Sequence, residues 1–340
     1  MKIQLTHGFE KMISVENLLV AWKEFARGKK HRKDVQAFSL RLMDNIFALH
    51  EELSHHTYNH GGYQAFKIND PKPRDIHKAS VRDRLVHHAI YRILYPFFDK
   101  TFIADSYSCR NEKGTHRAIN KFQSYFYKVS QNNTRTCWIL KCDIRKFFAN
   151  IDHQILLSIL AEYILDKNIM KLLENIIASF YAGLPLGNLT SQLFVNSYMN
   201  RFDQFVKHKL KAKYYIRYAD DFVFLSEDKK HLKEIIPTAE EFLKEELKLE
   251  MHPNKVFIKT LSSGVDFLGR INFFDYRILR TKTRRRMLRR MSLKQKMCRE
   301  ELVSKESLEQ SVQSYLGILR HCRGYAISKK LSVHKPGFLV

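Results

Sequence analysis

The chain has 340 residues, 44% hydrophobic and 12% aromatic, enough to bury the core of one large or two to three smaller structural units. Its 59 lysines and arginines against 35 aspartates and glutamates give a formal net charge of +24, which predicts a nucleic-acid partner rather than a merely basic, soluble protein. No CxxC spacing links the five cysteines, and no apolar run reaches the length of a membrane span or secretory signal, so we expect a reducing, intracellular setting without a zinc knuckle, disulfide framework or membrane.

The N-terminal part predicts two helical regions around a strand hairpin. Residues 14–55 have apolar residues at helical spacing, and Ser14 is the candidate N-cap. Residues 56–80 contain Gly, Pro and Asp between short extended pieces, which predicts strands and turns. Residues 81–100 predict a further helix, whose apolar face consists of Leu85, Ile90, Ile93 and Leu94.

The central part begins with a buried strand. "TCWILKCD" (136–143) is apolar until it ends in Asp143. A helix is predicted over 152–165, with Asp152 placed to cap it. Residues 183–210 form a loop with Gly and Pro that leads into a long helix.

Five more elements complete this region. "YYIRYADDFVFLS" (214–226) predicts two short strands that meet at a pair of aspartates, and 230–250 predicts a charged surface helix that Pro237 could interrupt. Residues 255–261 and 265–274 predict two further strands. The order strand, helix, strand, strand, helix, strand is that of a ferredoxin-like, split βαβ sheet, so the fold class is α+β. That fold hosts many functions and does not choose among them.

The C-terminal part, 281–340, differs in charge. Residues 281–300 contain nine basic residues and one acidic residue. A solvated basic helix is one interpretation. We favour a helix that packs through one face and meets phosphates with the other, because such a density of like charge is tolerated mainly beside an anion. The residues expected on the packed face are Met287, Leu288, Met291 and Met297.

Asp220 and Asp221 stand between apolar strands. Adjacent residues of a strand point to opposite faces, so only a tight hairpin lets both carboxylates leave the sheet at one edge. Ordinary turn aspartates would have Gly or Asn nearby and polar flanks, but the flanks of this pair are Tyr218 and Phe222. The pattern therefore indicates a functional pair.

A third carboxylate, Asp143, ends the strand expected to lie next to the pair. Clustered carboxylates repel each other unless a cation compensates them, and hard divalent cations prefer oxygen ligands. Three such side chains can hold two Mg²⁺ ions, which stabilise the attacking and leaving oxygens of phosphoryl transfer. In a basic protein this pattern predicts a nucleotidyl transferase, with a metal-dependent nuclease as the open alternative.

At this point the sequence resembles the reverse transcriptases. The similar blocks run in family order from about residue 60 to 270, and six of them agree. They are "KPRDIHKASVRDRLVHHAI" (72–90), "SYSCRNEKGTHRAI" (106–119), "LKCDIRKFFANIDH" (140–153), "GLPLGNLTSQLFVN" (183–196), "YADD" (218–221) and "HPNKVFIKTLSSGVDFLGR" (252–270).

Within that family the sequence is most similar to enzymes of bacterial diversity-generating retroelements. The pointer is "LGNLTSQ" (186–192), because group II intron enzymes usually carry Gln at the position of Leu186 and Pro at that of Gln192. The short length and the segment "ENLLVAWKEFARGKK" also resemble that group, and we expect no maturase-like extension or endonuclease domain after residue 340. The resemblance implies a cytoplasmic enzyme encoded by a bacterium, archaeon or phage.

The resemblance implies roles residue by residue. Asp143, Asp220 and Asp221, with the backbone of Ile144, would hold two Mg²⁺ ions, with Mn²⁺ as an alternative, and Lys255 would protonate the leaving pyrophosphate unless it is a plain surface lysine. The nucleotide site would consist of Lys72 and Arg74 at the triphosphate, Phe148 as the gate against a 2′-hydroxyl unless it is plain core, and Leu186, Gly187 and Gln192. The nucleic-acid contacts would be Arg110, the primer-grip turn Phe267, Leu268 and Gly269, and the basic residues Arg284, Arg285, Arg286, Arg289 and Arg290.

Three of these implications also have a physical argument. A bulky ring against the sugar discriminates by sterics, and arginine suits bidentate contact with phosphate oxygens. Leu186 cannot make the hydrogen bond that a glutamine could make to the nucleotide. Looser positioning weakens discrimination between correct and incorrect pairs, which agrees with the reduced fidelity opposite template adenines that the resemblance implies.

The resemblance implies a right-hand polymerase with fingers, a ferredoxin-like palm and a short helical thumb. The expected division is an N-terminal helical extension (1–55), fingers (56–135), palm (136–270, with part of the fingers near 165–190) and a basic helical thumb (271–340). Its implied partners are an RNA template, a DNA or RNA primer, dNTPs, a small basic accessory protein and a structured RNA of the same element.

Two other functions stay open. A reverse transcriptase of another bacterial class, from antiphage defence or derived from group II introns, would share the palm chemistry and would differ in genomic context. A catalytically idle nucleic-acid-binding scaffold is the hypothesis from a different class, and the intact set of three aspartates argues against it.

Overall fold

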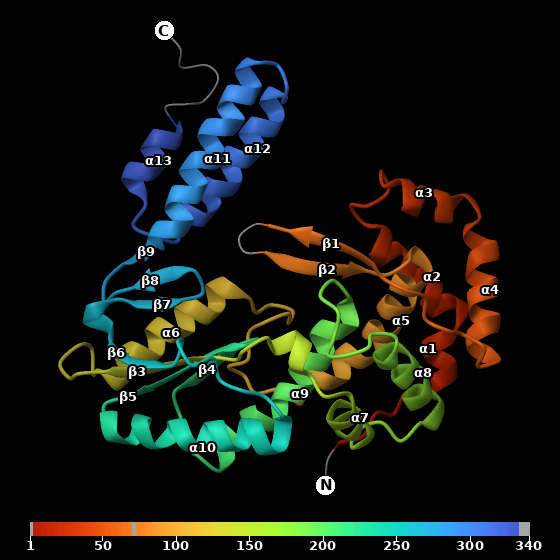
Figure 1. Ribbon diagram of the computed structural model, residues 1–340, viewed down its shortest axis with the longest axis horizontal. Coiled ribbons are helices and arrows are strands. Elements are labelled where there is room, and N and C mark those ends of the chain that lie inside the picture. The colour runs from red at the N-terminus through yellow and green to blue at the C-terminus, as the bar shows by residue number, and fades with distance from the viewer. Residues whose placement is uncertain (1–2, 70–72, 333–340) are drawn as a thin grey trace. The chain divides into compact units, whose positions relative to one another are not determined.

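The computed structural model describes residues 3–69 and 73–332, and it divides into two compact units (Figure 1). The first unit consists of residues 1–112, 142–222 and 235–255. The second consists of residues 113–141, 223–234 and 256–340. The chain passes between the units several times, and two strands of the central sheet begin in one unit and end in the other.

Four helices open the first unit, and the last three of them confirm the helical character predicted for 14–55. They are α1 (Phe9–Ile13), α2 (Val15–Ala26), α3 (Lys33–Leu40) and α4 (Leu42–Ser54). The Ser14 hydroxyl accepts a hydrogen bond from the Asn17 N–H, 3.2 Å, so Ser14 is the N-cap of α2. Leu18, Ala21 and Phe25 recur at helical spacing and are buried.

The predicted hairpin and following helix are present. β1 (Gln64–Ile68) pairs antiparallel with β2 (Arg74–Lys78), and α5 (Val81–Phe98) follows. The expected apolar face of α5 is buried. The sequence analysis missed α8 (Lys167–Ala178), although its signals are plain: Asp166 caps its N-terminus, and Ile169, Leu173 and Ile176 are buried at helical spacing.

The central sheet has the predicted split βαβ topology. Its strands are β3 (Trp138–Asp143), β4 (Tyr215–Tyr218), β5 (Asp221–Ser226) and β6 (Phe257–Thr260), in the spatial order β4-β5-β3-β6. After β3 the chain forms the short 3-10 helix η1 (Phe147–Asn150), α7 (His153–Ala161) and, after α8, the long α9 (Leu189–His208). Asp152 caps α7 by accepting from the Ile155 N–H. After β5, α10 (Lys229–Leu247) continues through Pro237, so the interruption considered for this helix does not occur.

The second unit contains α6 (Thr115–Val129) and a small antiparallel sheet of β7 (Val265–Phe267), β8 (Arg270–Asn272) and β9 (Arg277–Leu279), after the 3-10 helix η2 (Leu261–Ser263). The single strand expected over 265–274 is therefore wrong. Leu268 and Gly269 adopt left-handed φ angles of 51° and 82°, which turn the chain back between β7 and β8.

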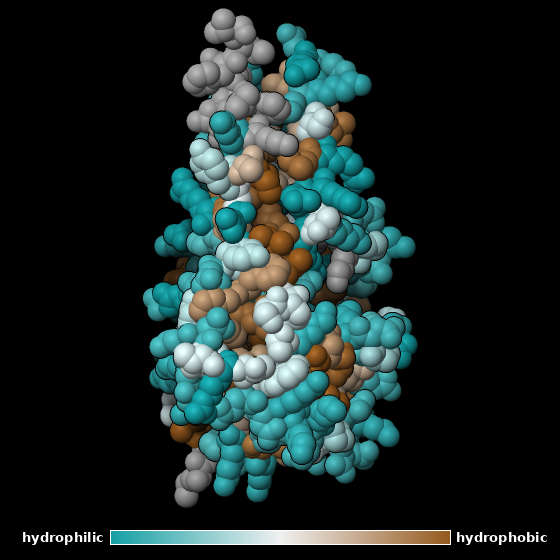
Figure 2. Space-filling view, turned by 90° about the vertical axis from the view of Figure 1, so that its left-hand side faces the viewer, coloured by the Kyte–Doolittle hydropathy of each residue, from teal (hydrophilic) through white to brown (hydrophobic). Residues whose placement is uncertain are grey.

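Three helices end the described chain: α11 (Thr281–Arg299), α12 (Lys305–Leu319) and α13 (Tyr325–Ser332), side by side in Figure 1. Their core includes Met287, Met291, Leu308 and Val312. Leu288, expected on the packed face, is instead 36% exposed, because it directly follows the buried Met287 and adjacent residues of a helix do not share a face. Figure 2 shows a largely hydrophilic face with a narrower apolar band. No helix in the described ranges is long and apolar enough to cross a bilayer.

Candidate active site

The two adjacent aspartates lie at the tight turn between β4 and β5. Ala219 adopts a left-handed φ of 54°, and β5 begins with Asp221. β3, the neighbour of β5 in the sheet, ends at Asp143. The N–H of Ile144 donates a 3.1 Å hydrogen bond to the carbonyl oxygen of Asp220. The fold therefore places the third carboxylate beside the pair.

The carboxylates of this cluster repel one another when they are charged. Burial, then the carboxylates of Asp221 and Asp143, raise the pKa of Asp220 to about 6, and Lys255 opposes this shift only weakly. The Lys255 ammonium donates a 2.6 Å hydrogen bond to Oδ1 of Asp143, which is 8% exposed. The site thus holds three acidic groups against one base, and a further cation would relieve the repulsion.

The donor set fits a hard divalent cation, because it offers carboxylate and backbone oxygens and no sulfur or imidazole. The raised pKa of Asp220 is a second observation in favour, since a bound cation would offset the cost of keeping this buried carboxylate charged beside its acidic neighbours. Among the residues that the structure describes, no three His, Cys, Asp or Glu side chains already converge as a closed metal site. Lys255 occupies one oxygen of Asp143 instead.

A buried ion pair contacts the turn that holds Asp220 and Asp221. The sequence analysis assigned this pair no role. Arg217 and Asp203 are both 0% exposed, and their side chains meet in a bidentate pair of 2.7–3.0 Å. Arg217 also donates to the carbonyl oxygen of Ala219 at 3.2 Å, inside the turn. The signal was available: an arginine within "YYIRYADD", in a strand that is otherwise buried, must have a partner.

The loop before α9 is fixed to the β1–β2 hairpin. The N–H of His77 donates to the carbonyl oxygen of Leu186 at 2.9 Å. Gly187 has a φ of 126°, and a Cβ there would lie 3.1 Å from the carbonyl oxygen of His77. Leu186 and Gln192 are both half-buried, and Gly187 is exposed. These predicted nucleotide-site residues therefore lie on a loop and helix start held in place by the β1–β2 hairpin.

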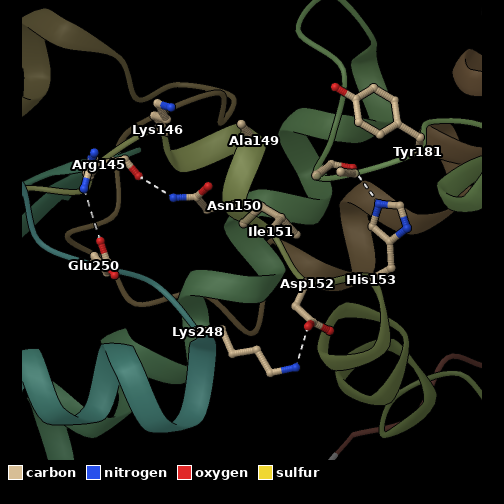
Figure 3. A pocket seen from close by; sticks show the side chains of 12 residues that line it. Arg145, Lys146, Ala149, Asn150, Ile151, Asp152, His153, Tyr181, Lys248 and Glu250 are labelled. Atoms are coloured by element: carbon tan, nitrogen blue, oxygen red, sulfur yellow. Dashed lines mark hydrogen bonds and ion pairs between the residues drawn. The ribbon is translucent and has the colours of Figure 1, made fainter.

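The same loop is fixed at its other end to the segment of the predicted sugar gate. The carbonyl oxygen of Phe148 accepts from the Leu184 N–H at 2.8 Å, and a Cβ on Gly183 would lie 2.4 Å from that oxygen. Nε2 of His153 lies 2.6 Å from the Gly183 carbonyl oxygen, as the dashed line in Figure 3 shows. Phe148 itself is half-buried, whereas its neighbour Phe147 is core.

A comparison with models of protein families now decides the family. The model described as "Reverse transcriptase (RNA-dependent DNA polymerase)" matches residues 67–271, more than half of the chain. The chain belongs to this reverse transcriptase family. The match covers β2 of the hairpin, the central sheet, all three aspartates and Lys255.

Curated relatives of this reverse transcriptase share about a quarter of its residues. Protein YkfC of Escherichia coli is 25% identical over 63% of this chain and 65% of its own length. The group II intron-encoded protein LtrA of Lactococcus lactis is 23% identical over 79% of this chain and 53% of its own. The putative COX1/OXI3 intron 2 protein of Saccharomyces cerevisiae is 21% identical over 62% of this chain and 30% of its own. The chain thus spans only a third to two thirds of these relatives.

Among solved structures, telomerase from Candida albicans in complex with a fragment of telomeric RNA is similar to this chain with a TM-score of 0.49 and 13% identity. The alignment covers 66% of this reverse transcriptase and 46% of that chain.

The structure of this reverse transcriptase shows a cleft of about 630 Å³ beside η1, which the sequence analysis did not single out (Figure 3). Lys146, with a left-handed φ of 45°, and Tyr181 line it. Two ion pairs cross its rim, Lys248 with Asp152 at 2.6 Å and Arg145 with Glu250 at 3.6 Å. The basic side chains of Arg145 and Lys146, just after β3, were the sequence signal for this cleft.

The remaining predicted contacts fall into two groups. Arg110 is not presented to a ligand, because Asp99 and the carbonyl oxygens of Ile103 and Ser106 occupy its guanidinium, and the side chain is 6% exposed. Phe267 is fully buried against Phe122. The others are accessible: Arg74, Arg284, Arg285, Arg289 and Arg290 are exposed, and Leu268, Gly269 and Arg286 are half-buried. Lys72 lies outside the described residues.

Proposed function

We propose that this chain is an RNA-directed DNA polymerase that extends a primer 3′-hydroxyl on an RNA template with dNTPs. The observation that carries the proposal is the placement of Asp143 beside Asp220 and Asp221 at adjoining strand ends, in a chain of the reverse transcriptase family. The net charge of +24 supports a polyanionic template and primer. The fingers, palm and thumb are proposed with the boundaries predicted from the sequence.

In this proposal Asp143, Asp220 and Asp221, with the Ile144 carbonyl, hold two divalent ions, Mg²⁺ being the first candidate. Bound there, such ions neutralise the phosphates and stabilise the attacking and leaving oxygens of nucleotidyl transfer. Lys255, 2.6 Å from Asp143, would donate a proton to the departing pyrophosphate, and its contact with this carboxylate supports that role.

The substrate would be positioned by two segments. Phe148 would face the sugar and exclude a 2′-hydroxyl by sterics, and Arg74 would contact the triphosphate. Leu186, Gly187 and Gln192 would lie along the base pair being formed. The hydrogen bonds from His77 to Leu186 and from Leu184 to Phe148 support this arrangement, because they hold both selective segments in one backbone frame.

Primer extension by the full chain on a defined RNA template tests the proposal. With Mg²⁺ and all four dNTPs we expect DNA complementary to the template, and no product when the metal is chelated. The native locus transcript is a second template for the same assay, since enzymes of the diversity-generating group work with an element RNA and a small basic accessory protein. Absence of DNA on both templates with that accessory protein present would refute the polymerase.

We further propose that the enzyme copies its template with errors at adenines, as part of a diversity-generating retroelement. The half-buried Leu186 supports this, because its apolar side chain offers no hydrogen bond to an incoming nucleotide. A reverse transcriptase of another bacterial class would give accurate products and lack a template and variable repeat pair nearby.

Replacing Leu186 by glutamine tests the error-prone role. We expect Leu186→Gln to lower misincorporation opposite adenine by about tenfold, the scale of one hydrogen bond of ~1.4 kcal/mol. Errors opposite the other bases should change less. The measurement is sequencing of primer-extension products, with Leu186→Met as the control that conserves volume without adding a polar group. An unchanged error spectrum in Leu186→Gln would contradict the role.

A further inference from the structure

The second unit contains a basic cleft of about 650 Å³ that none of the roles above uses. Its walls are α6, the β8–β9 turn and the turn between α12 and α13. Three arginines line it, Arg277, Arg320 and Arg323, together with His321 and a single acidic residue, Asp275. The volume lies within the roughly 300–1,000 Å³ of ordinary ligand sites.

Two of these arginines are held in place by neutral groups. Arg277 donates to the side-chain amides of Asn120, at 3.0 Å, and Gln123, both on α6. The Arg323 guanidinium lies 5.3 Å from the centre of the Tyr276 ring, and that ring stacks on Phe273. The backbone N–H of Arg323 donates a 2.7 Å hydrogen bond to the carbonyl oxygen of Arg277, so the two side chains start from neighbouring points of the backbone. They are oriented before any ligand arrives.

The positive charge of the cleft exceeds its negative charge, since three arginines line it with Asp275 as its one acidic lining residue. Within residues 3–69 and 73–332, no carboxylate forms an ion pair with Arg277, Arg320 or Arg323. Behind the cleft, Arg270 is 5% exposed, and its Nη2 lies 3.3 Å from His116, whose ring packs on His321 at 3.8 Å.

The lowered pKa values of Arg277 and His116 reflect the same excess of positive charge. The pKa of Arg277 is lowered, first by burial and then by Arg270. The pKa of His116 is lowered by burial, His321, Arg270 and Arg277 in turn. Positive groups that depress one another's pKa are relieved by an anion, and oriented guanidinium groups suit phosphate oxygens.

We propose that this cleft is a second nucleic-acid site, which binds the phosphate backbone of a single strand through Arg277, Arg320 and Arg323. The site uses residues of the second unit only, and it does not depend on polymerisation. Phosphates are the shared chemistry of a strand and of free pyrophosphate. The strand is favoured because the cleft is open and larger than one phosphate group needs, and because the whole chain is strongly basic.

The experiment measures binding of a labelled 20-nucleotide single-stranded RNA, and of the DNA of the same sequence, by anisotropy over a range of salt. Removal of two phosphate contacts in Arg320→Gln/Arg323→Gln should lower the slope of log K against log salt by about 1.4, and Arg320→Gln alone by about 0.7, at roughly 0.7 per contact. The same fall is expected for RNA and DNA. The matched control, Lys209→Gln/Lys233→Gln, removes the same charge from exposed positions and should leave the slope nearly unchanged.

Three outcomes would overturn the proposal. The first is a slope for the double arginine variant equal to that of the lysine control. The second is a fall confined to one kind of strand, which phosphate recognition alone does not produce. The third is binding of inorganic pyrophosphate that depends on Arg320 and Arg323 while the strand slopes stay unchanged. Thermal unfolding of Arg320→Gln, which changes one exposed side chain, shows that a fall in slope does not come from misfolding.

Discussion

Asp220→Asn is expected to abolish DNA synthesis, by about a thousandfold or more, while leaving the protein folded. The substitution keeps the shape of the side chain and removes one of the charges proposed to hold the metal ions, whose stabilisation of the transition state is worth several kcal/mol. Primer extension measures the loss, and binding of the primer–template at saturating concentration is expected to persist. Synthesis at the wild-type rate would remove Asp220 from the catalytic set.

Asp220→Asn is expected to increase the folding stability, although it abolishes DNA synthesis. The pKa of Asp220 in the folded protein, about 6, lies above its ordinary value of 3.8, so its charged form costs folding free energy. That cost is absent below pH 3.8, grows as the pH rises through 6, and reaches at most roughly 3 kcal/mol above it. In metal-free buffer, Asp220→Asn should therefore gain stability over the wild type between pH 4 and 7. Urea unfolding at both pH values measures the difference, and a gap that does not widen with pH would show that the Asp220 charge is not its cause.

The second large effect is expected at Arg217. In Arg217→Met the carboxylate of Asp203 stays fully buried without its guanidinium, and removal of one partner of a buried pair costs about 3–5 kcal/mol. Because Arg217 also holds the Ala219 carbonyl oxygen, the aspartate turn loses its support and synthesis should fall with stability. Chemical unfolding and primer extension at a temperature where the variant is folded measure the two effects.

Two comparisons make the Arg217 result specific. Replacing both partners, in Arg217→Met/Asp203→Leu, should recover most of the lost stability, although Tyr215 then loses the acceptor that its hydroxyl meets at 2.8 Å. Synthesis should stay low in this double variant. Arg201→Met breaks a partly exposed pair with Glu162 and should cost less than about 1 kcal/mol. Equal losses in Arg217→Met and Arg201→Met would show that burial of the pair carries no weight.

Local sequence signals predicted most of the fold. Caps at Ser14 and Asp152, the alternation of strands and helices, and the aspartate pair between apolar runs all depend on neighbours within a few residues, and the structure confirms them. The error in the strand expected over 265–274 arose where single backbone angles decide whether a strand continues or turns. The positive φ at Leu268 and Gly269 divides one expected strand into two, and nothing in the side chain of Leu268 announces that conformation.

Site residues that depend on distant partners were harder to predict. The motif around Arg110 predicts a nucleic-acid contact, but its guanidinium is satisfied by Asp99 and backbone carbonyl oxygens. Arg217 stands within its motif without a predicted role, because Asp203 is on a helix and its approach depends on the tertiary fold. Sequence patterns show which residue types are present, whereas burial and pairing decide which of them are free to act.

The contact between Gly183 and the carbonyl oxygen of Phe148 has a consequence for how selectivity can change. The segment proposed to test the sugar and the loop proposed to test the base share this backbone contact and the hydrogen bond from Leu184, so neither can move alone. Mutations that relax one kind of discrimination should disturb the other, and their effects should be strongly epistatic. An enzyme built in this way would evolve its tolerance of ribonucleotides and its error rate as one linked trait.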